Sequence, residues 1–327
     1  MLFVDNRHTT DPRFNLALEE FLLRHASTDE PLLLLTINEP SVIIGRNQNV
    51  WEELDPVAIR KRNIHLVRRL SGGGTVYHDL GNLNYSFITQ GQRDLHKFER
   101  VTKPIINALR DLGVEAELRG RSDIVVQGKK ISGNAQYASR GRMFSHGTLL
   151  FDSNLAALNQ AIKPRQATIE SKAVQSIRSS VCNLKELLPA GMSITDLRRA
   201  ILAEIFGHGE IQTFGLTGED WDQIEQIAAE RYMSWDWNIG RSPRFTLVRS
   251  QQYSAGTVEV RLEVEKGAIK RLTIAGDYCR GRESSRLEKQ LAGVRYDADD
   301  LLVALQNLEN ESFFAELRKE EFVDLLY

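Results

Sequence analysis

Residues Arg68 to Asn84 read Arg-Arg-Leu-Ser-Gly-Gly-Gly-Thr-Val-Tyr-His-Asp-Leu-Gly-Asn-Leu-Asn, with three consecutive glycines shortly after two arginines. Glycine has no β-carbon, so a ligand can approach the backbone N–H groups of such a run closely. The guanidinium group of arginine binds phosphate or carboxylate oxygens in a bidentate manner. This stretch is therefore predicted to bind an anionic or extended ligand.

The residues on both sides of the glycine run are typical of β-strands. Ile64 to Leu70 precede the run and Leu83 to Thr89 follow it. This arrangement predicts a connection at the edge of an antiparallel sheet rather than a turn from a strand into a helix. Neither G-x-x-x-x-G-K-[ST] nor G-x-G-x-x-G occurs in the chain, which excludes the commoner phosphate-binding loops.

The composition is that of an ordinary globular protein, with 42% hydrophobic and 26% charged residues among 327. A net charge of -2 gives no reason to expect a nucleic acid as partner. The longest apolar run, Pro31 to Leu35, is far shorter than the ~20 residues that a membrane helix needs. Two cysteines and an amino terminus without a secretory pattern predict a cytoplasmic protein that has no disulfides and no membrane partner.

Apolar periodicity and turn residues predict a chain in which helices and strands alternate. Helices are expected at residues 13–25, 55–62, 97–112, 154–162, 193–207 and 220–232. Strands are expected at residues 32–36, 42–45, 114–118, 123–126, from 130 onward, and 143–151. Lys130 begins the returning strand of a hairpin, and its neighbour Lys129 should point to the opposite face.

Two domains are expected, at residues 1–243 and 250–327, with a linker at residues 241–250. The second domain should contain hairpin strands at residues 256–264 and 268–274, followed by helices from Leu287. The polar residues 163–180 show little periodicity and are predicted to form a mobile active-site loop.

Four further segments lie along the chain in the order of a known family. They are Gly120-Arg-Ser-Asp123, Lys130-Ile-Ser-Gly-Asn-Ala135, His146-Gly-Thr-Leu-Leu150 and Ser176-Ile-Arg178. Together with the glycine stretch, they closely resemble the signatures of the lipoate-protein ligases, in the superfamily of biotin and lipoate attachment enzymes. The resemblance implies an α+β fold, in which helices flank a mixed, largely antiparallel sheet, with a small α+β accessory domain at the carboxyl end.

The resemblance also implies a reaction in two steps. Lipoate would attack the α-phosphate of ATP to give lipoyl-AMP and pyrophosphate, and a lysine of a carrier domain would then take the lipoyl group. The carrier would be an E2 subunit of a 2-oxoacid dehydrogenase, or a glycine cleavage H or H-like protein. Mg²⁺ is expected to bridge the ATP phosphates with few protein ligands, and Asp123 is the candidate contact. A monomer is expected.

The motifs assign roles to individual residues. In the family, the lysine matching Lys130 lies between carboxylate and α-phosphate, so Lys130 is the candidate catalytic residue. The candidate contacts to ATP or lipoate are Arg69, Ser71, Gly73, Gly74, Val76, Tyr77, His78, Asn82, Asp123, Ser132, Gly133, His146 and Thr148. His78 is interpreted as an orienting residue because the reaction needs no enzyme base. The strands that carry Leu34, Ile44 and Val76 are expected to line an apolar slot for the lipoyl tail.

Several positions depart from the usual family pattern. Thr36 stands where many members have tryptophan, Ser122 where they have asparagine, Ser145 where they have histidine, and Ala173 where they have glycine. Cys182 stands where threonine is usual. The departures leave open the choice between lipoate and octanoate and the identity of the carrier. Two alternatives also stay open: an ATP-independent octanoyl or lipoyl transferase that uses Cys182, and a non-catalytic protein that binds lipoate or the carrier.

Overall fold

The computed structural model describes residues 1–157, 162, 164, 167–177, 179–279, 284–306 and 313–327. The chain forms two compact units, and each unit is assembled from separate stretches. The first contains Met1–Arg46, Pro56–Lys163 and Ser176–Ser234, and the second contains Asn47–Asp55, Pro164–Gln175 and Trp235–Tyr327. The sequence-based boundaries divide the chain only once, whereas the chain enters the second unit three times.

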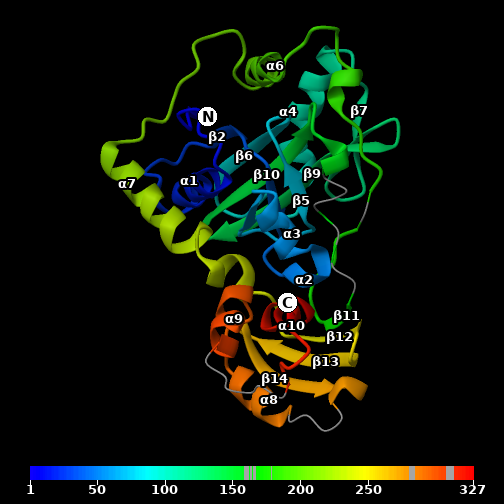
Figure 1. Ribbon diagram of the computed structural model, residues 1–327. Coiled ribbons are helices and arrows are strands. Elements are labelled where there is room, and N and C mark those ends of the chain that lie inside the picture. Colours follow the sequence, from blue (N-terminus) through cyan, green and yellow to red (C-terminus); the bar gives the residue numbers. More distant parts are fainter. Residues whose placement is uncertain (158–161, 163, 165–166, 178, 280–283, 307–312) are drawn as a thin grey trace. The chain divides into compact units, whose positions relative to one another are not determined.

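A seven-stranded mixed sheet is the main element of the first unit (Figure 1). Its strands are, in spatial order, β1 (Leu2–Val4), β2 (Leu32–Ile37), β6 (Asn82–Gln90), β10 (Arg142–Leu150), β9 (Lys129–Ser139), β8 (Asp123–Val126) and β7 (Ala116–Arg119). Only β1 and β2 are parallel, and every other neighbouring pair is antiparallel. The predicted fold class is confirmed.

The two faces of this sheet have different coverings because side chains alternate along each strand. Leu33 and Tyr85 belong to a core with apolar residues of helices α4 (Phe98–Asp111) and α6 (Ile194–Phe206). Leu34 and Ser86, one position along, point to the opposite face and line a cavity together with residues of helix α1 (Pro12–His25). One face therefore stabilises the unit and the other carries the candidate site.

A separate three-stranded sheet corrects the prediction for the glycine run. Its spatial order is β4 (His65–Arg68), β3 (Ser41–Ile44) and β5 (Val76–His78), with β3 parallel to β4 and antiparallel to β5. The glycine run joins the two outer strands of this sheet, so it does not connect neighbours of one antiparallel sheet. Strand β6, the expected partner, belongs to the larger sheet. Strand β5 is three residues long, too short for an alternating pattern to be read from the sequence.

Local sequence signals placed most remaining elements of the first unit correctly. Ser193 and Asp196 form the expected capping box of α6, and Gly207 ends that helix. The β8–β9 hairpin turns at Gln127 and Gly128, both with positive φ, as a tight two-residue turn requires. The other helices are α3 (Pro56–Lys61), α7 (Gly218–Ile227), η1 (Leu184–Glu186) and η2 (Ala228–Tyr232). The helix expected at residues 154–162 lies partly outside the described residues.

The second unit contains a four-stranded sheet whose spatial order is β11 (Thr168–Ser171), β12 (Phe245–Tyr253), β13 (Gly256–Glu265) and β14 (Ala268–Ala275). Two predictions were wrong here. Part of the expected mobile loop forms strand β11, and the expected linker at residues 241–250 contains the start of β12. Phe245 and Leu247 of β12 are buried and Thr246 is exposed, so the second half of the expected linker has the alternating pattern of a strand.

Aromatic side chains form the core of the second unit. The ring centroid of Trp51 lies 5.0 Å from those of Phe245 and Tyr296 and 6.2 Å from that of Tyr327. The helices of this unit are α2 (Val50–Glu53), η3 (Asp236–Gly240), η4 (Asp277–Cys279), α8 (Ser285–Leu291), α9 (Ala298–Gln306) and α10 (Lys319–Leu326). No helix within the described residues of either unit combines the length and the apolarity that crossing a bilayer requires.

Candidate active site

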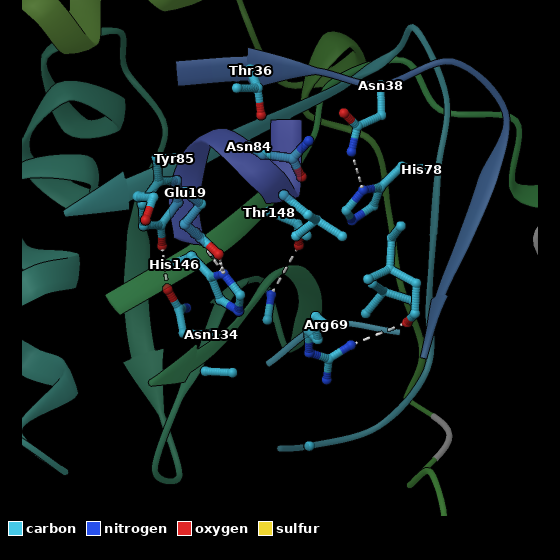
Figure 2. Close-up of a pocket in the computed structure, with 18 of the residues that line it drawn as sticks. Glu19, Thr36, Asn38, Arg69, His78, Asn84, Tyr85, Asn134, His146 and Thr148 are labelled. Atoms are coloured by element: carbon cyan, nitrogen blue, oxygen red, sulfur yellow. Dashed lines mark hydrogen bonds and ion pairs between the residues drawn. The ribbon is translucent and has the colours of Figure 1, made fainter. Parts of the chain in front are cut away.

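A cavity of about 160 Å³ lies in the first unit and is lined by both of its sheets and by α1 (Figure 2). Nine of the residues predicted from the sequence line it: Arg69, Gly73, Val76, His78, Asp123, Lys130, Gly133, His146 and Thr148. Leu34 and Val76 also line it, as the predicted apolar slot requires, but Ile43 does so in place of Ile44. Neighbouring residues of a strand point to opposite faces, which explains the error of one position.

A second cavity adjoins the first. The two share Val76, Lys130, Gly133 and Thr148 among their lining residues. The predicted residues Tyr77 and Ser132 line only the second cavity, whose other walls combine apolar residues such as Leu150 and Val181 with polar ones such as Thr75 and Ser179. Tyr77 and Ser132 directly neighbour Val76 and Gly133 in their strands, so adjacent positions of each strand contribute to the cavity walls. Lys130 therefore lies where the two cavities meet.

The backbone of β9 is irregular at Lys130. Val125 pairs with Lys130 but Ile124 pairs with Ser132, so the β8–β9 ladder contains a bulge at this point. Bulges redirect side chains and are frequent beside active sites. The Lys130 N–H donates to Ser180 O at 2.9 Å, and Lys130 O accepts from Cys182 N at 3.1 Å. The lysine is thus fixed by a second segment as well as by its own hairpin.

The side chain of Lys130 has an ion-pair partner and a reserved space. Its Nζ lies 2.9 Å from Oδ1 of Asp123. A β-carbon at Gly133 would lie 3.0 Å from both Cε and Nζ of Lys130, so the glycine provides the room that this side chain occupies. Lys129 is exposed and lines neither cavity, as predicted.

Arg69 holds the glycine run in shape. Its buried guanidinium donates to the carbonyl oxygens of Ile43 at 3.0 Å, of Gly72 at 2.7 Å and of Gly74 at 2.7 Å. Burial lowers the pKa of Arg69 to about 10, so the group keeps its charge at neutral pH. Most of its donors are used within the protein. A contact from Arg69 to phosphate or carboxylate stays a prediction. The sequence did not indicate that Arg69 binds backbone carbonyl groups of the glycine run.

Arg69 also begins a chain of hydrogen bonds that ends at a buried carboxylate. Arg69 Nε donates to Ser71 Oγ at 3.0 Å. Ser71 Oγ lies 2.8 Å from His146 Nε2, and His146 Nδ1 lies 2.9 Å from Glu19 Oε1. Each hydrogen in this chain has an acceptor if Ser71 donates to His146 and a neutral His146 donates to Glu19. Glu19 was not predicted as a site residue, although a glutamate directly beside the buried Leu18 of an amphipathic helix is a recognisable signal.

His78 is held by a row of amides rather than by Asp79. Asn6 Nδ2 donates to Asn15 Oδ1, Asn15 Nδ2 donates to Asn38 Oδ1, and Asn38 Nδ2 donates to His78 Nδ1, each at 2.8 to 2.9 Å. Burial, together with the charge of Arg69, lowers the pKa of His78 to about 3. His78 is therefore neutral, with its hydrogen on Nε2. Asp79 instead accepts from the N–H groups of Gly81 and Asn154.

The other predicted residues lie close to the cavities without lining them. Ser71 and Gly74 are bonded to Arg69, and the N–H beside Gly74, that of Thr75, donates to Ser176 Oγ at 2.8 Å. Asn82 is buried, and its Nδ2 donates to Asn84 Oδ1 at 2.8 Å. These contacts make Ser71, Gly74 and Asn82 supports of the cavity walls.

The positions that depart from the family pattern lie in different surroundings. Thr36 and Ser122 line the first cavity. Ser145 Oγ accepts from Gln136 Nε2 at 2.8 Å, and Ala173 belongs to the second unit. Cys182 is half-buried against apolar core residues, and burial raises the pKa of its thiol. A raised pKa lowers the thiolate fraction that a nucleophile needs.

The described residues contain no group of three or more His, Cys, Asp or Glu side chains that could hold a metal ion by themselves. Two carboxylates line the first cavity: Glu19 bonds His146, and Asp123 pairs with Lys130. A divalent ion that arrives with phosphate oxygens needs only one or two protein carboxylates. Asp123, which is partly exposed, fits that requirement.

Two family models match the chain. Residues 11–206 match the lipoyl protein ligase A/B catalytic domain, and residues 242–326 match the bacterial lipoate protein ligase C-terminus. The lipoate-protein ligase LplJ of Bacillus subtilis is 47% identical over 331 residues, with both chains fully covered. Lipoate–protein ligase 1 of Staphylococcus aureus is 41% identical over 327 residues, again with full coverage of both.

Solved structures give the same result. LipL1 of P. falciparum in complex with lipoate matches with a TM-score of 0.63 and 26% identity, over 97% of this chain and 98% of that one. A bi-partite lipoate protein ligase from Thermoplasma acidophilum, described with its E2 lipoyl domain, has a TM-score of 0.62 at 26% identity and covers 72% and 94%. Lipoate-protein ligase A bound with ATP has a TM-score of 0.59 at 28% identity and covers 70% and 94%. This chain belongs to the lipoate-protein ligases, a family of enzymes.

Proposed function

We propose that the protein activates free lipoate with ATP to give lipoyl-AMP and pyrophosphate, and then transfers the lipoyl group to a lysine of a carrier domain. One observation carries this proposal. The amine of Lys130 lies where two adjoining cavities meet, so a single cation can contact a ligand in each. Such a position suits a reaction that joins two substrates.

The two cavities differ in a way that assigns a substrate to each. The first lies between the two sheets and α1, and is suited to an acyl chain whose carboxylate points toward Lys130. The second has apolar walls from Tyr77, Leu150 and Val181, which suit the faces of an adenine ring. ATP in the second cavity would then direct its phosphates toward Lys130 and the glycine run.

The chemistry follows from this placement. A lipoate carboxylate oxygen attacks the α-phosphorus, a P–O bond forms, and the bond to the β-phosphate oxygen breaks to release pyrophosphate. The Lys130 ammonium offsets the repulsion between the two anions and stabilises the charge that develops in the transition state. Orientation of the two reactants supplies a further contribution on the order of 7 to 11 kcal/mol. Mg²⁺ bound through the phosphates, with Asp123 as a contact, would neutralise part of their charge.

The second step needs no enzyme nucleophile either. The carrier lysine nitrogen attacks the carbonyl carbon of lipoyl-AMP, an amide bond forms, AMP leaves, and the amine releases a proton to solvent. Lys130 then polarises the mixed anhydride. We propose that the carrier is an E2 domain or a glycine cleavage H-type domain. We also propose that the ligase is monomeric and cytoplasmic. The T. acidophilum ligase described with its E2 lipoyl domain supports the first of these assignments.

The thioester transferase is the less favoured alternative. Its nucleophile would be Cys182, whose thiol has a raised pKa and packs against the apolar core. Cys182 also lines neither of the cavities that contain Lys130. A non-catalytic binder is the second alternative, and it would leave no reason for a lysine to be fixed between two cavities.

Two adjacent lysines provide a matched test. Lys130→Ala should reduce pyrophosphate release with lipoate, ATP and Mg²⁺ by about a hundred- to a thousandfold, in line with the loss of a preorganised charge contact. Lys129→Ala removes an exposed lysine from the same strand and should behave as the parent. Thermal melting of both variants reports whether each is folded. Equal activity in the two folded variants would reject the proposal, as would a parent that binds lipoate but never releases pyrophosphate.

A further inference from the structure

A third cavity, of about 280 Å³, lies on the opposite face of the larger sheet from the first. Leu35, Ile37 and Leu83 line it, whereas Thr36 and Asn84, which alternate with them along β2 and β6, line the first cavity. Neighbouring residues of a strand point to opposite faces, so the same two strand segments separate the two cavities. The other lining residues come from the segment before α1, the β5–β6 turn and α6, and are Asn6, His8, Thr9, Thr10, Leu80 and Arg198.

The third cavity contains an arginine whose charge is not neutralised by a neighbour. Arg198 is half-buried, and its guanidinium carbon lies 5.5 Å from the ring centroid of Phe3. The next residue, Arg199, pairs with Asp196, whereas Arg198 has no ion pair or hydrogen bond with any described residue. Among the described residues that line this cavity there is no carboxylate. A carboxylate ligand would therefore meet a guanidinium group that is able to bind both of its oxygens.

The rest of the third cavity suits a short apolar group. Leu80 is 59% exposed and lies with Leu35, Ile37 and Leu83 along the cavity, so a ligand that covers it removes apolar surface from water. Leu80 is also the only exposed large apolar side chain among the described residues that line the cavity. A stable protein interface needs a much larger apolar centre. These properties favour a free small molecule over a docked protein.

A row of side chains joins the third cavity to the first. Asn6 lines the third cavity, whereas Asn15, Asn38 and His78 line the first. Hydrogen bonds of 2.8 to 2.9 Å connect the four in this order, and Figure 2 shows the last of them. The carbonyl oxygen of Thr9 accepts from Asn6 Nδ2 at 2.9 Å and from Asn15 Nδ2 at 3.1 Å. A ligand that moves Asn6 or Thr9 would therefore disturb the row that holds His78.

The backbone beside this row is held in an uncommon conformation. Arg7 and His8 have φ angles of 52° and 56°, in the left-handed region that residues other than glycine rarely adopt. Such residues persist only where surrounding contacts hold them. Here Arg7 N–H donates to Asp5 Oδ1 at 2.9 Å, and the Arg7 guanidinium carbon lies 4.4 Å from the ring centroid of Trp221. A ligand that contacts His8 adds to these contacts and so changes the balance that sets the conformation of the loop.

We infer that the third cavity is an effector site for a small monocarboxylate with a short apolar body. The carboxylate binds Arg198, and the apolar body covers Leu80 and the hydrocarbon wall beside it. The occupant is coupled to His78 through the row of amides. The site is independent of the proposed reaction, since it shares no lining residue with either cavity that contains Lys130.

Histidine NMR observes both ends of this coupling in one experiment. Protein labelled with ¹⁵N in histidine is titrated with 3-methylbutanoate, and the uncharged 3-methylbutanamide is the control ligand. The signals of His8, in the third cavity, and of His78, in the first, should shift along one saturation curve with the acid and stay unchanged with the amide. Arg198→Gln should weaken the binding at least about tenfold, as the loss of charge-assisted hydrogen bonds implies. Arg199→Gln removes the neighbouring arginine, which does not line the cavity, and should keep the parent curve.

A second variant tests the row itself. Asn6→Ala removes its first hydrogen bond, so the acid should still shift the His8 signal but no longer that of His78. Thermal melting reports whether this variant is folded, and Arg198→Gln, which changes only a half-buried side chain, tests the site without it.

Three results would overturn the inference. A shift of His78 at parent affinity in Arg198→Gln would show that the acid enters the first cavity directly. A shift of His8 alone in the parent would show that the two cavities are not coupled, and equal shifts with acid and amide would show that charge is not recognised. Pyrophosphate release from lipoate and ATP is measured separately, without the acid, and Arg198→Gln should match the parent. Its absence in both proteins would reject the ligase reaction and leave the effector site intact.

Discussion

The Oγ atom of Ser71 lies 2.8 Å from Nε2 of His146, although the two residues are 75 positions apart in the chain. Through His146, the first residue of the Ser-Gly-Gly-Gly run is tied to Glu19 of α1. The glycine run has little conformational preference of its own. Its shape is therefore imposed by groups outside it.

Glu19→Ala should destabilise the protein by about 1 to 3 kcal/mol because it leaves the partly buried His146 Nδ1–H without its acceptor. Glu19→Gln keeps an acceptor oxygen and should lose less. Urea unfolding curves for both variants give the difference, provided that their m values agree with the parent. Identical losses in the two variants would show that charge, rather than the hydrogen bond to His146, is what matters at Glu19.

The glycines of the run should differ in their tolerance of a β-carbon. At Gly74 it would lie 3.0 Å from Ser176 Oγ and 3.3 Å from Ser176 Cα, whereas at Gly72 it would meet nothing within 4 Å. Gly74→Ala should weaken the binding of ATP and lipoate roughly tenfold by displacing the serine that accepts from Thr75 N–H. Gly72→Ala is the matched control. Calorimetric titration that gave the same constants for both variants would show that the contact with Ser176 is unimportant.

The low pKa of His78 predicts a loss of stability in acid. The pKa is about 3 in the folded protein against the ordinary 6.5, so the unfolded chain takes up a proton first as the pH falls. The contribution of His78 is complete above pH 6.5 and decreases by about 1.4 kcal/mol per pH unit between 6.5 and 3.

Since carboxylates also titrate in this range, the measurement is the difference in unfolding free energy between the parent and His78→Gln at several pH values. The curve of the parent should be the steeper one between pH 4 and 6 by roughly 1 kcal/mol per unit. Parallel curves would show that His78 takes up its proton in the folded state.

Cys182→Ser should keep ATP-dependent acylation of a carrier domain within a few-fold of the parent, since adenylation uses no enzyme nucleophile. The assay is run with lipoate and ATP, and again with an acylated donor protein and no ATP. Activity is expected only in the first. Transfer without ATP by the parent, lost in a folded Cys182→Ser variant, would establish the thioester transferase instead.

The sequence predicted those parts of the fold that depend on local signals. Caps, turns and apolar periodicity located α1, α6 and the β8–β9 hairpin. Strand partners were harder to predict because the strand patterns of β4 and β6 do not show that the two strands belong to different sheets. Strand β12 was not recognised because it contains Arg249 and Ser250 and directly follows Pro243 and Arg244.

The candidate site was predicted where a motif marks it and missed where tertiary contacts create it. Lys130, Gly133 and His78 line the first cavity as expected. The roles of Glu19 and Asn38 depend on hydrogen bonds to residues far away in the chain. A single sequence does not show such pairs, because each partner alone is an ordinary polar residue.

The aromatic core of the second unit has a consequence for synthesis on the ribosome. Trp51 is made early, but its partners Phe245, Tyr296 and Tyr327 lie much further along the sequence. Until these later segments have been synthesised, the indole has none of these neighbours, and β11 has no β12 to pair with. Apolar groups and strand edges that stay exposed during synthesis favour aggregation. In a protein consisting of residues 1–243 alone, Trp51 and β11 should stay exposed permanently. Such a shortened enzyme should stay in solution only if Trp51 and the β11 segment are redesigned.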